Sequence, residues 1–224
     1  MAKIILIAPP SPFTDQLQSA FLSLGHDMVY VNDRSNYLVP SFLGQNRIAW
    51  KIIRKVGALR VRNNALFAKD ILAIAQREKP DLVFINKGMI IKRPTLEALR
   101  AQGAVVVNWF VDNMKHDRYR DWFHEHYRDY DYFLSFDSRM VEEVPVSDRH
   151  RILFCPLAVQ PEFFVPSTRM DRLTAGDVCF IGAPYPERVK ALEALRSFRP
   201  VIYGWDAWKK TSLADLYQGP ASLG

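Results

Sequence analysis

Two polar residues, Asp112 and Asn113, follow an almost wholly apolar segment, Ala104–Phe110. We expect that segment to be a buried strand of a parallel sheet, and such sheets bind ligands beyond the carboxyl ends of their strands. A carboxylate at that edge can take a proton from a hydroxyl group or hydrogen-bond to a sugar. We therefore predict Asp112 as a catalytic residue and Asn113 as a ligand-binding one. The alternative is an Asx turn that ends the strand.

A second candidate site begins at Gly182, where the chain has the sequence GAPYPER up to Arg188. An apolar strand, a tight loop and a helix place backbone N–H groups and a helix N-terminus at the carboxyl end of a sheet, which suits an anionic phosphate. The guanidinium of Arg188 adds a bidentate donor. Gly182 and Arg188 are therefore predicted to bind a diphosphate, and an ordinary turn with a solvent-facing arginine is the alternative.

Two further residues are expected at the edge that carries Asp112. Lys87 ends the apolar run DLVFINKG, and Ser11 follows the first apolar run, Ile4–Ala8. Lys87 suits a phosphate or an acidic ligand, although an ordinary turn explains it equally well. We expect Thr14 to cap the helix that follows, which should run to about Leu24 and stop at Gly25.

The basic character of the chain is local. The net charge is +6, and Arg47–Arg62 contains six basic residues and no acidic one, so the remainder is neutral. Apolar residues recur there at helical spacing beside the basic stripe. Such a helix suits an anionic surface, so we predict membrane contact through Arg47, Lys51, Arg54 and Lys55. A solvated basic face over a buried stripe is the alternative, and no nucleic-acid module accompanies the charge.

Histidines and cysteines give no metal or disulfide signal. Met114–Asp131 contains three histidines, but His124 and His126 point roughly 200° apart on a helix, so only one of them can join His116. We expect a charged surface helix there and no metal. Cys155 and Cys179 are expected in strands, as reduced core residues of a cytoplasmic protein. No run reaches the roughly 20 apolar residues of a membrane span.

Strands alternate with helices along the chain, and the strands are apolar on both faces. This pattern predicts an α/β fold, a Rossmann-like parallel sheet with helices on both faces. We expect helices at Arg47–Leu59, Asn64–Arg77 and Pro94–Ala101. The expected strands are Ile4–Ala8, Met28–Val31, DLVFINKG, Ala104–Phe110, Tyr132–Ser135 and Ile152–Cys155.

The segment Asp177–Trp208 begins a second unit of the same kind, with a strand, a loop, an amphipathic helix and another strand. We therefore predict a first domain at 1–166 and an incomplete second Rossmann-like domain at 167–224. Such a start cannot cover both faces of a parallel sheet, so we expect a two-domain enzyme lacking most of its second half. If the chain is instead a non-catalytic binding module, exposed apolar surface on that half is expected to favour a partner or a homodimer.

Four segments resemble, in order and spacing, the GT-B glycosyltransferases, in particular the CgeB-like (spore maturation) branch. They are VVVNWFVDN, CPLAVQPEFFVP, DVCFIGAPYPERVKALEAL and VIYGWDAW. The resemblance covers most of the chain and is loose before residue 80. The late acidic residue near a Gly-rich loop, with which the family holds its donor, has no counterpart here.

This resemblance implies that the full enzyme transfers a sugar from a nucleotide-sugar to a glycan, lipid-linked or other cell-surface acceptor. Gly182 and Arg188 would bind the donor diphosphate, since Arg188 matches a basic residue that does so in the family. Asn113, Lys87 and Ser11 would bind the acceptor beside the catalytic Asp112. The family generally needs no bound metal, so no cofactor is implied beyond the nucleotide-sugar substrate. We expect a location in the cytoplasm, at the inner membrane surface. The alternative is a non-catalytic Rossmann-like module that binds a ligand or a protein.

Overall fold

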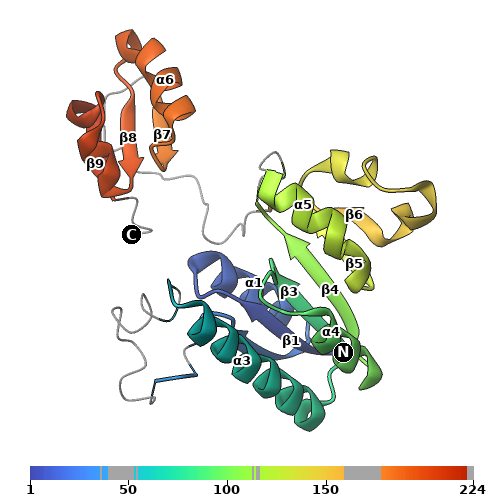
Figure 1. The fold of residues 1–224 in the computed structure, drawn as a ribbon. Coiled ribbons are helices and arrows are strands. Elements are labelled where there is room, and N and C mark those ends of the chain that lie inside the picture. The colour runs from blue at the N-terminus through green and yellow to red at the C-terminus, as the bar shows by residue number, and fades with distance from the viewer. Residues whose placement is uncertain are drawn as a thin grey trace. The chain divides into compact units, whose positions relative to one another are not determined.

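The computed structural model describes residues 1–35, 37–39, 53, 55–112, 114, 117–158 and 178–220. The chain divides into two compact units, Met1–Phe164 and Val165–Gly224 (Figure 1). The predicted domain boundary, between residues 166 and 167, lies outside the described residues. In the described ranges, no helix is long and apolar enough to cross a membrane.

The first unit is built on a six-stranded parallel sheet with the order β2-β1-β3-β4-β5-β6. From β1 the chain first adds β2 on one side and then continues to β3 on the other, so the direction of winding reverses between β1 and β3. Ligands of open α/β sheets bind at such a switch point, beyond the carboxyl ends of the strands. The strands are β1 (Lys3–Ala8), β2 (Asp27–Asn32), β3 (Leu82–Asn86), β4 (Val105–Phe110), β5 (Tyr132–Ser135) and β6 (Ile152–Phe154).

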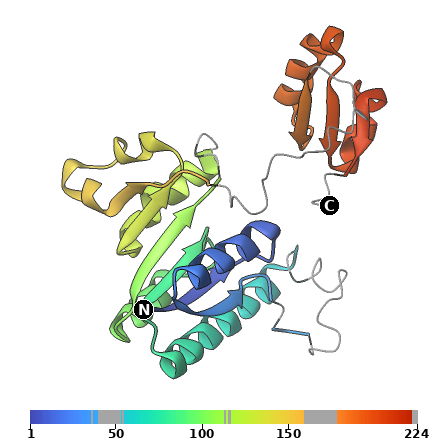
Figure 2. The same ribbon diagram turned by 180° about the vertical axis from the view of Figure 1, so that it is seen from behind.

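Helices cover both faces of this sheet, because successive strand residues point to opposite sides. On one face Ile5 and Ile7 pack in a core with Phe67 and Ile71 of α3, and on the other face Ile4 packs in a core with α1. Figures 1 and 2 show α1 and α3 on opposite faces. The predicted α/β fold class is confirmed. The helices are α1 (Pro12–Ser23), α3 (Gly57–Glu78), α4 (Arg93–Ala101) and α5 (Asp117–His126).

Helix α3 differs from the prediction. Residues 57–78 form one continuous helix, so the predicted end at Leu59 and the predicted new start at Asn64 are both wrong. Asn63, a residue that often breaks helices, is buried instead and satisfied by tertiary contacts. Its Oδ1 accepts a hydrogen bond from the Tyr37 N–H at 2.8 Å, and its Nδ2 donates one to the Ser35 carbonyl at 3.3 Å.

The cap of α1 is Ser11, and the prediction of Thr14 as the cap was wrong. Ser11 has extended backbone angles, and its Oγ accepts a hydrogen bond from the Thr14 N–H at 3.2 Å. Thr14 lies inside the first turn, buried, and its hydroxyl donates to the Pro9 carbonyl at 2.6 Å. Pro12, at the start of the helix, favours this earlier beginning. Gly25, with a φ of +79°, follows the helix as predicted.

The second unit is a smaller α/β layer with the parallel strand order β7-β8-β9. Its strands are β7 (Cys179–Gly182), β8 (Val201–Gly204) and β9 (Tyr217–Gly219), and its helix is α6 (Pro186–Ala194). The predicted order of strand, loop, helix and strand is therefore present. The core of the unit is formed by Leu192, Ile202, Trp208 and Leu213. Six 3-10 helices complete the described elements of the chain: η2 (Tyr127–Asp129), η3 (Ser138–Val141), η4 (Val146–Arg151), η5 (Arg196–Phe198), η6 (Asp206–Lys210) and η7 (Ala214–Leu216).

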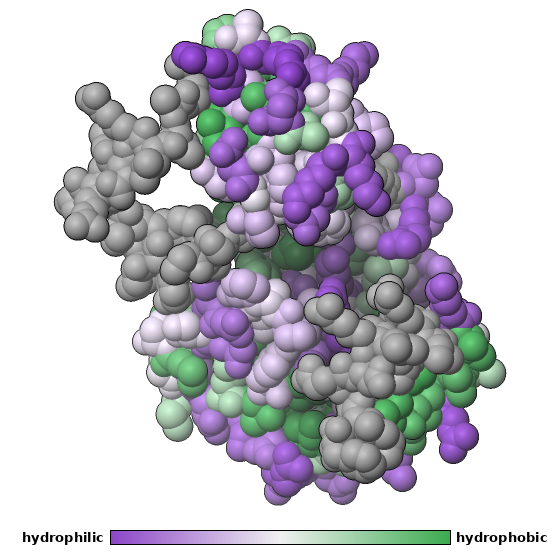
Figure 3. Space-filling view, turned by 90° about the vertical axis from the view of Figure 1, so that its left-hand side faces the viewer, coloured by the Kyte–Doolittle hydropathy of each residue, from purple (hydrophilic) through white to green (hydrophobic). Residues whose placement is uncertain are grey.

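Several large apolar side chains of the second unit are exposed, as the sequence predicted. They include Ile181, Tyr185, Phe198 and Trp205. The two cysteines are not the core residues that were predicted. Cys179 is exposed because it lies on the uncovered face of β7, and Cys155 follows β6 and is only partly buried. Over the face shown in Figure 3, hydrophobic residues lie among hydrophilic ones.

Strands β7 and β8 approach so closely at their carboxyl ends that only glycine fits at position 204. Gly204 has a φ of +147°, and a Cβ there would overlap the carbonyl oxygen of Gly182. Gly219 has a φ of +132° but open space around it. Gly204→Ala should therefore cost at least about 2 kcal/mol more than Gly219→Ala, which shares the backbone strain alone. Hydrogen exchange of the β7 and β8 amides measures this difference, and equal protection in the two variants would contradict it.

Candidate functional site

Polar residues from three loops of the first unit meet beside the switch point. Asp33 follows β2, and its N–H donates to the Ala8 carbonyl at the end of β1 at 3.3 Å. Lys87 follows β3, and its N–H donates to the Trp109 carbonyl in β4 at 3.1 Å. Asp112 follows β4. These backbone bonds tie the loops after β2 and β3 to a neighbouring strand, so the sheet fixes the positions of those two loops.

Lys87 and Asp112, which the sequence indicated separately, form an ion pair. The Lys87 Nζ lies 2.5 Å from Asp112 Oδ2, and the two side chains are 34% and 28% exposed. The carboxylate oxygen of this contact is buried. The lysine therefore neutralises the carboxylate mainly by charge, and neither residue presents an isolated charge at this edge.

The backbone turn that carries Lys87 requires glycine at its next position. Lys87 and Gly88 both have a φ of +67°, the left-handed region. A Cβ at Gly88 would lie 2.6 Å from Ile85 Cγ2, 3.0 Å from the Tyr130 hydroxyl and 3.1 Å from Asn108 Nδ2. The Asn108 amide donates to the Lys87 carbonyl at 2.9 Å. Buried side chains therefore pack against the inner side of this turn and hydrogen-bond to it.

Asp33 is a candidate that the sequence analysis missed. Its Oδ1 is buried and has no hydrogen-bond partner. Burial raises the pKa of Asp33 to about 6, against the opposing charges of Arg34 and Lys87. Asp33 follows β2, an edge strand that is mostly only partly buried, so the pattern of a polar residue after a buried strand did not single it out.

Buried polar atoms without a hydrogen-bond partner gather around this edge. Within the described part of the chain they are Asp33 Oδ1, Asn86 Nδ2, Asn108 Oδ1, the Tyr130 hydroxyl oxygen and Asp112 Oδ2, the last of which has Lys87 as its ion-pair partner. Asp33, Asn86 and Asp112 lie at or just beyond the carboxyl ends of β2, β3 and β4. Asn108 lies within β4, and the Tyr130 hydroxyl reaches Gly88. Folded proteins leave few such groups unpaired, and functional sites are one place where they do.

The other predicted contact residues divide into those with a structural role and those outside the described range. Ser11 caps α1, and its hydroxyl lies 3.0 Å from the Thr14 hydroxyl. Lys55 is exposed. Asn113, Arg47, Lys51 and Arg54 lie outside the described residues.

In the second unit, Arg188 folds over the loop between β7 and α6. Its Nη1 donates to the Ala183 carbonyl at 3.3 Å, and its guanidinium lies 4.8 Å from the centre of the Tyr185 ring. Gly182 makes this possible, because a Cβ there would lie 3.1 Å from Arg188 Nη1 and from the Phe180 ring. The N–H groups of Tyr185 and Arg188 are bonded within the loop. The exposed guanidinium is therefore the better candidate for an anion ligand than those two amides.

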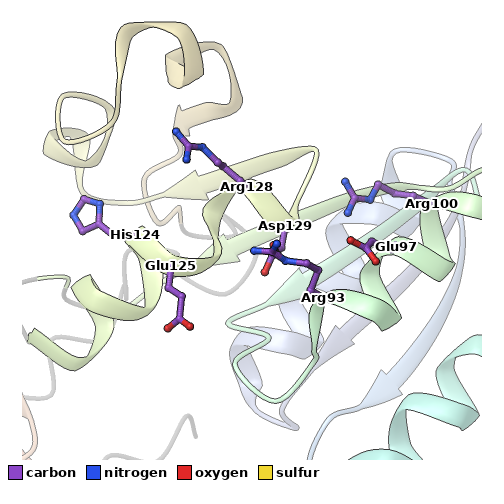
Figure 4. Close-up of a pocket in the computed structure, with 7 residues that line it drawn as sticks. All are labelled: Arg93, Glu97, Arg100, His124, Glu125, Arg128 and Asp129. Atoms are coloured by element: carbon purple, nitrogen blue, oxygen red, sulfur yellow. The ribbon is translucent and has the colours of Figure 1, made fainter.

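A pocket of about 380 Å³ lies between α4 and the segment of α5 and η2 (Figure 4). Its arginines are already paired with carboxylates: Arg93 with Asp129 at 2.6 Å, Arg128 with Asp148 at 2.7 Å and Arg100 with Asp131 at 3.8 Å. This balance of charge does not favour an anionic ligand. Among the described residues, no group of three or more His, Cys, Asp or Glu is arranged to hold a metal ion.

Comparison with known proteins identifies the fold. No protein-family model and no curated protein matches the chain. The S. aureus MnaA–UDP co-structure matches at 12% identity with a TM-score of 0.57, over 99% of this chain and 69% of that one. A putative UDP-N-acetylglucosamine 2-epimerase from Listeria monocytogenes matches at 11% identity with a TM-score of 0.56, over 99% and 69%. The spinosyn rhamnosyltransferase SpnG with thymidine diphosphate matches at 13% identity with a TM-score of 0.43, over 91% of this chain and 65% of that one.

At these identities the likeness shows the fold alone. The chain has the GT-B-like, Rossmann-type α/β architecture of these solved structures. The fold and the polar edge at the switch point together define the candidate site.

Asp33 should make the stability of the first unit depend on pH. Its pKa is about 6 in the folded chain and about 3.8 ordinarily, so between these values the folded chain keeps a proton that the unfolded chain has lost. Stability should therefore fall as the pH rises through this window. Asp33→Asn should match the parent at pH 4 and exceed its free energy of unfolding by about 1–3 kcal/mol at pH 7.

Denaturant titrations at both pH values, with hydrogen exchange of β1 and β2 as the readout, measure this difference. Asp27→Asn is the matched control, since Asp27 lies at the opposite end of β2 and is exposed. Parallel pH profiles for the parent and Asp33→Asn would contradict the assignment.

Proposed function

We propose that this chain belongs to a nucleotide-sugar-dependent enzyme, a glycosyltransferase of the GT-B type and of its CgeB-like branch. The enzyme transfers a sugar to a glycan or lipid-linked acceptor at the inner membrane surface. The observation that carries this proposal is the polar edge of Asp33, Lys87 and Asp112 at the switch point of a fold shared with a UDP co-structure. The motifs that resemble the CgeB-like branch supply the finer assignment.

The first unit binds the acceptor in this proposal. The Lys87–Asp112 pair offers both a donor and an acceptor of hydrogen bonds, which suits a hydroxyl-rich ligand. Asn113 and Ser11 are expected to add contacts to the same ligand. Positioning of the acceptor hydroxyl supplies much of the rate in such a reaction.

The second unit binds the donor diphosphate. The acceptor oxygen attacks the anomeric carbon of the donor sugar, and the nucleoside diphosphate leaves with the electron pair of the broken carbon–oxygen bond. Negative charge grows on the departing diphosphate, and Arg188 stabilises it by charge-assisted hydrogen bonds. The nucleotide-sugar is the substrate, and no further cofactor enters this proposal.

A second candidate is a nucleotide-sugar 2-epimerase. The observation in its favour is that two solved neighbours with TM-scores above 0.5 carry that title, from Listeria monocytogenes and Methanocaldococcus jannaschii. Incubation with UDP-N-acetylglucosamine separates the candidates, because an epimerase converts the donor with no acceptor present. A chain that binds nucleotides without turning them over would instead be the non-catalytic module.

Arg188→Ala should weaken nucleoside diphosphate binding by about 1.5–3 kcal/mol, the scale of a hydrogen bond to a charged group. Calorimetry with UDP comes first, because the MnaA co-structure contains UDP, and dTDP, GDP and ADP follow. The control is Lys190→Ala, which removes an equal charge from the exposed side of the same helix. Equal affinity of the parent and Arg188→Ala for every nucleotide would refute the donor site.

Replacing Lys51, Arg54 and Lys55 with Gln should lower binding to anionic vesicles at low salt by more than about tenfold, since each basic residue near the surface contributes about 1 kcal/mol. Sedimentation with vesicles of phosphatidylcholine and phosphatidylglycerol measures it. The control removes three charges from the second unit, by replacing Lys190, Lys209 and Lys210 with Gln. Equal loss in both triple variants would mean a non-specific charge effect and no docking helix.

A further inference from the structure

We propose that Asp33 accepts the proton of the acceptor hydroxyl, and that the Lys87–Asp112 ion pair orients the acceptor beside it. This inference rests on the proposed function. It changes one assignment, because the sequence analysis predicted Asp112 as the catalytic carboxylate. The argument for it comes from the position, the pairing and the burial of the two carboxylates.

The sheet holds Asp33 at the end of β2, one strand away from the switch point between β1 and β3. Its N–H donates to the Ala8 carbonyl at 3.3 Å, so the residue extends the β1–β2 register by one position beyond the strands. The next residue is also fixed, because the Arg34 N–H donates to Asn32 Oδ1 at 2.8 Å. The backbone on both sides of the carboxylate is therefore anchored, which is what a proton acceptor of defined geometry requires.

The two carboxylates differ in their partners. Asp112 has the Lys87 ammonium 2.5 Å away, and a proton on that carboxylate would leave the lysine charge without its counterion. Asp33 Oδ1 has no hydrogen-bond partner, so a proton arriving there disrupts no contact of that atom. A ligand hydroxyl that donates to Asp33 Oδ1 would satisfy a buried oxygen that the fold alone leaves unpaired.

The electrostatic surroundings of Asp33 also suit a base that works near neutral pH. Burial raises the pKa of Asp33 to about 6, while Arg34 on the same loop and Lys87 on the β3 loop lower it. Burial raises the pKa of the Tyr30 phenol on β2, and the Asp33 charge raises it further. General bases are most effective when their pKa lies near the working pH.

The proton and electron balance is complete with the substrates alone. The acceptor R–OH gives its proton to an Asp33 carboxylate oxygen as its own oxygen forms a bond to the anomeric carbon. The bond from that carbon to the diphosphate oxygen breaks, and its electron pair leaves with the nucleoside diphosphate. Asp33 then releases the proton to water, so the net products are the glycoside, the nucleoside diphosphate and one proton.

The test is nucleoside diphosphate release by the full chain from UDP-N-acetylglucosamine, UDP-glucose, dTDP-glucose and GDP-mannose, with water as the acceptor. We expect Asp33→Asn to lower kcat by about 100-fold or more, with KM for the donor nearly unchanged. The acid limb of the parent's pH–kcat profile should centre near pH 6 and be absent in the variant. Asp33→Glu should restore part of the rate. Asp27→Asn, at the exposed far end of β2, should match the parent.

Each other outcome is decisive. If Asp33→Asn keeps the parent's kcat and acid limb while Asp112→Asn loses both, Asp33 is not the base and the proposed function stands. If Asp33→Asn loses UDP affinity along with kcat, and Asp33→Glu does not recover either, the role of Asp33 is structural and the inference is overturned. If the parent neither binds UDP nor releases it from any donor, both the inference and the proposed function are refuted.

Discussion

The tight turn at Lys87 and Gly88 is the constraint on which the candidate site depends. It has two consecutive residues in the left-handed region, and its glycine has no room for a side chain. Asn108 in β4 holds the Lys87 carbonyl, and the Tyr130 hydroxyl closes the space beneath Gly88. Because this turn directly follows β3, it fixes where the lysine leaves the sheet and hence where it meets Asp112. The ion pair is thus a consequence of backbone geometry and of the buried side chains below it.

The polar groups at the carboxyl edge of the sheet lower the stability of the folded state. Unpaired buried polar atoms are costly, and a partly buried carboxylate whose pKa is raised disfavours folding at neutral pH. The two hydrophobic clusters of the first unit lie on opposite faces of the sheet, under the helices. Buried polar groups without hydrogen-bond partners at the switch point of a sheet are typical of a functional site, and the proposed function assigns its ligand to this edge for that reason. This concentration links the packing of the unit to the function proposed for it.

Much of the architecture could be predicted from the sequence, because apolar runs of strand length alternate with helical ones. Lys87 and Asp112 were also predictable, since each directly follows such a run. Their pairing was not, because it depends on the strand order and on the left-handed turn. The continuity of α3 through Asn63 was not predictable, because the tertiary hydrogen bonds of that side chain are invisible in a local pattern. Asp33 was missed because its burial depends on how neighbouring loops pack around it. The steric role of Gly182, which makes room for Arg188, also appears only in three dimensions.

The most direct test of the central claim is a ¹³C NMR titration of the Asp33 side-chain carboxyl. If a buried, unpaired carboxylate stands beside the Lys87–Asp112 pair, Asp33 should titrate with a pKa of about 6. Replacing Lys87 with Met should raise that pKa further, because the lysine charge lowers it. A pKa near the ordinary 3.8 that does not respond to the loss of Lys87 would contradict the claim.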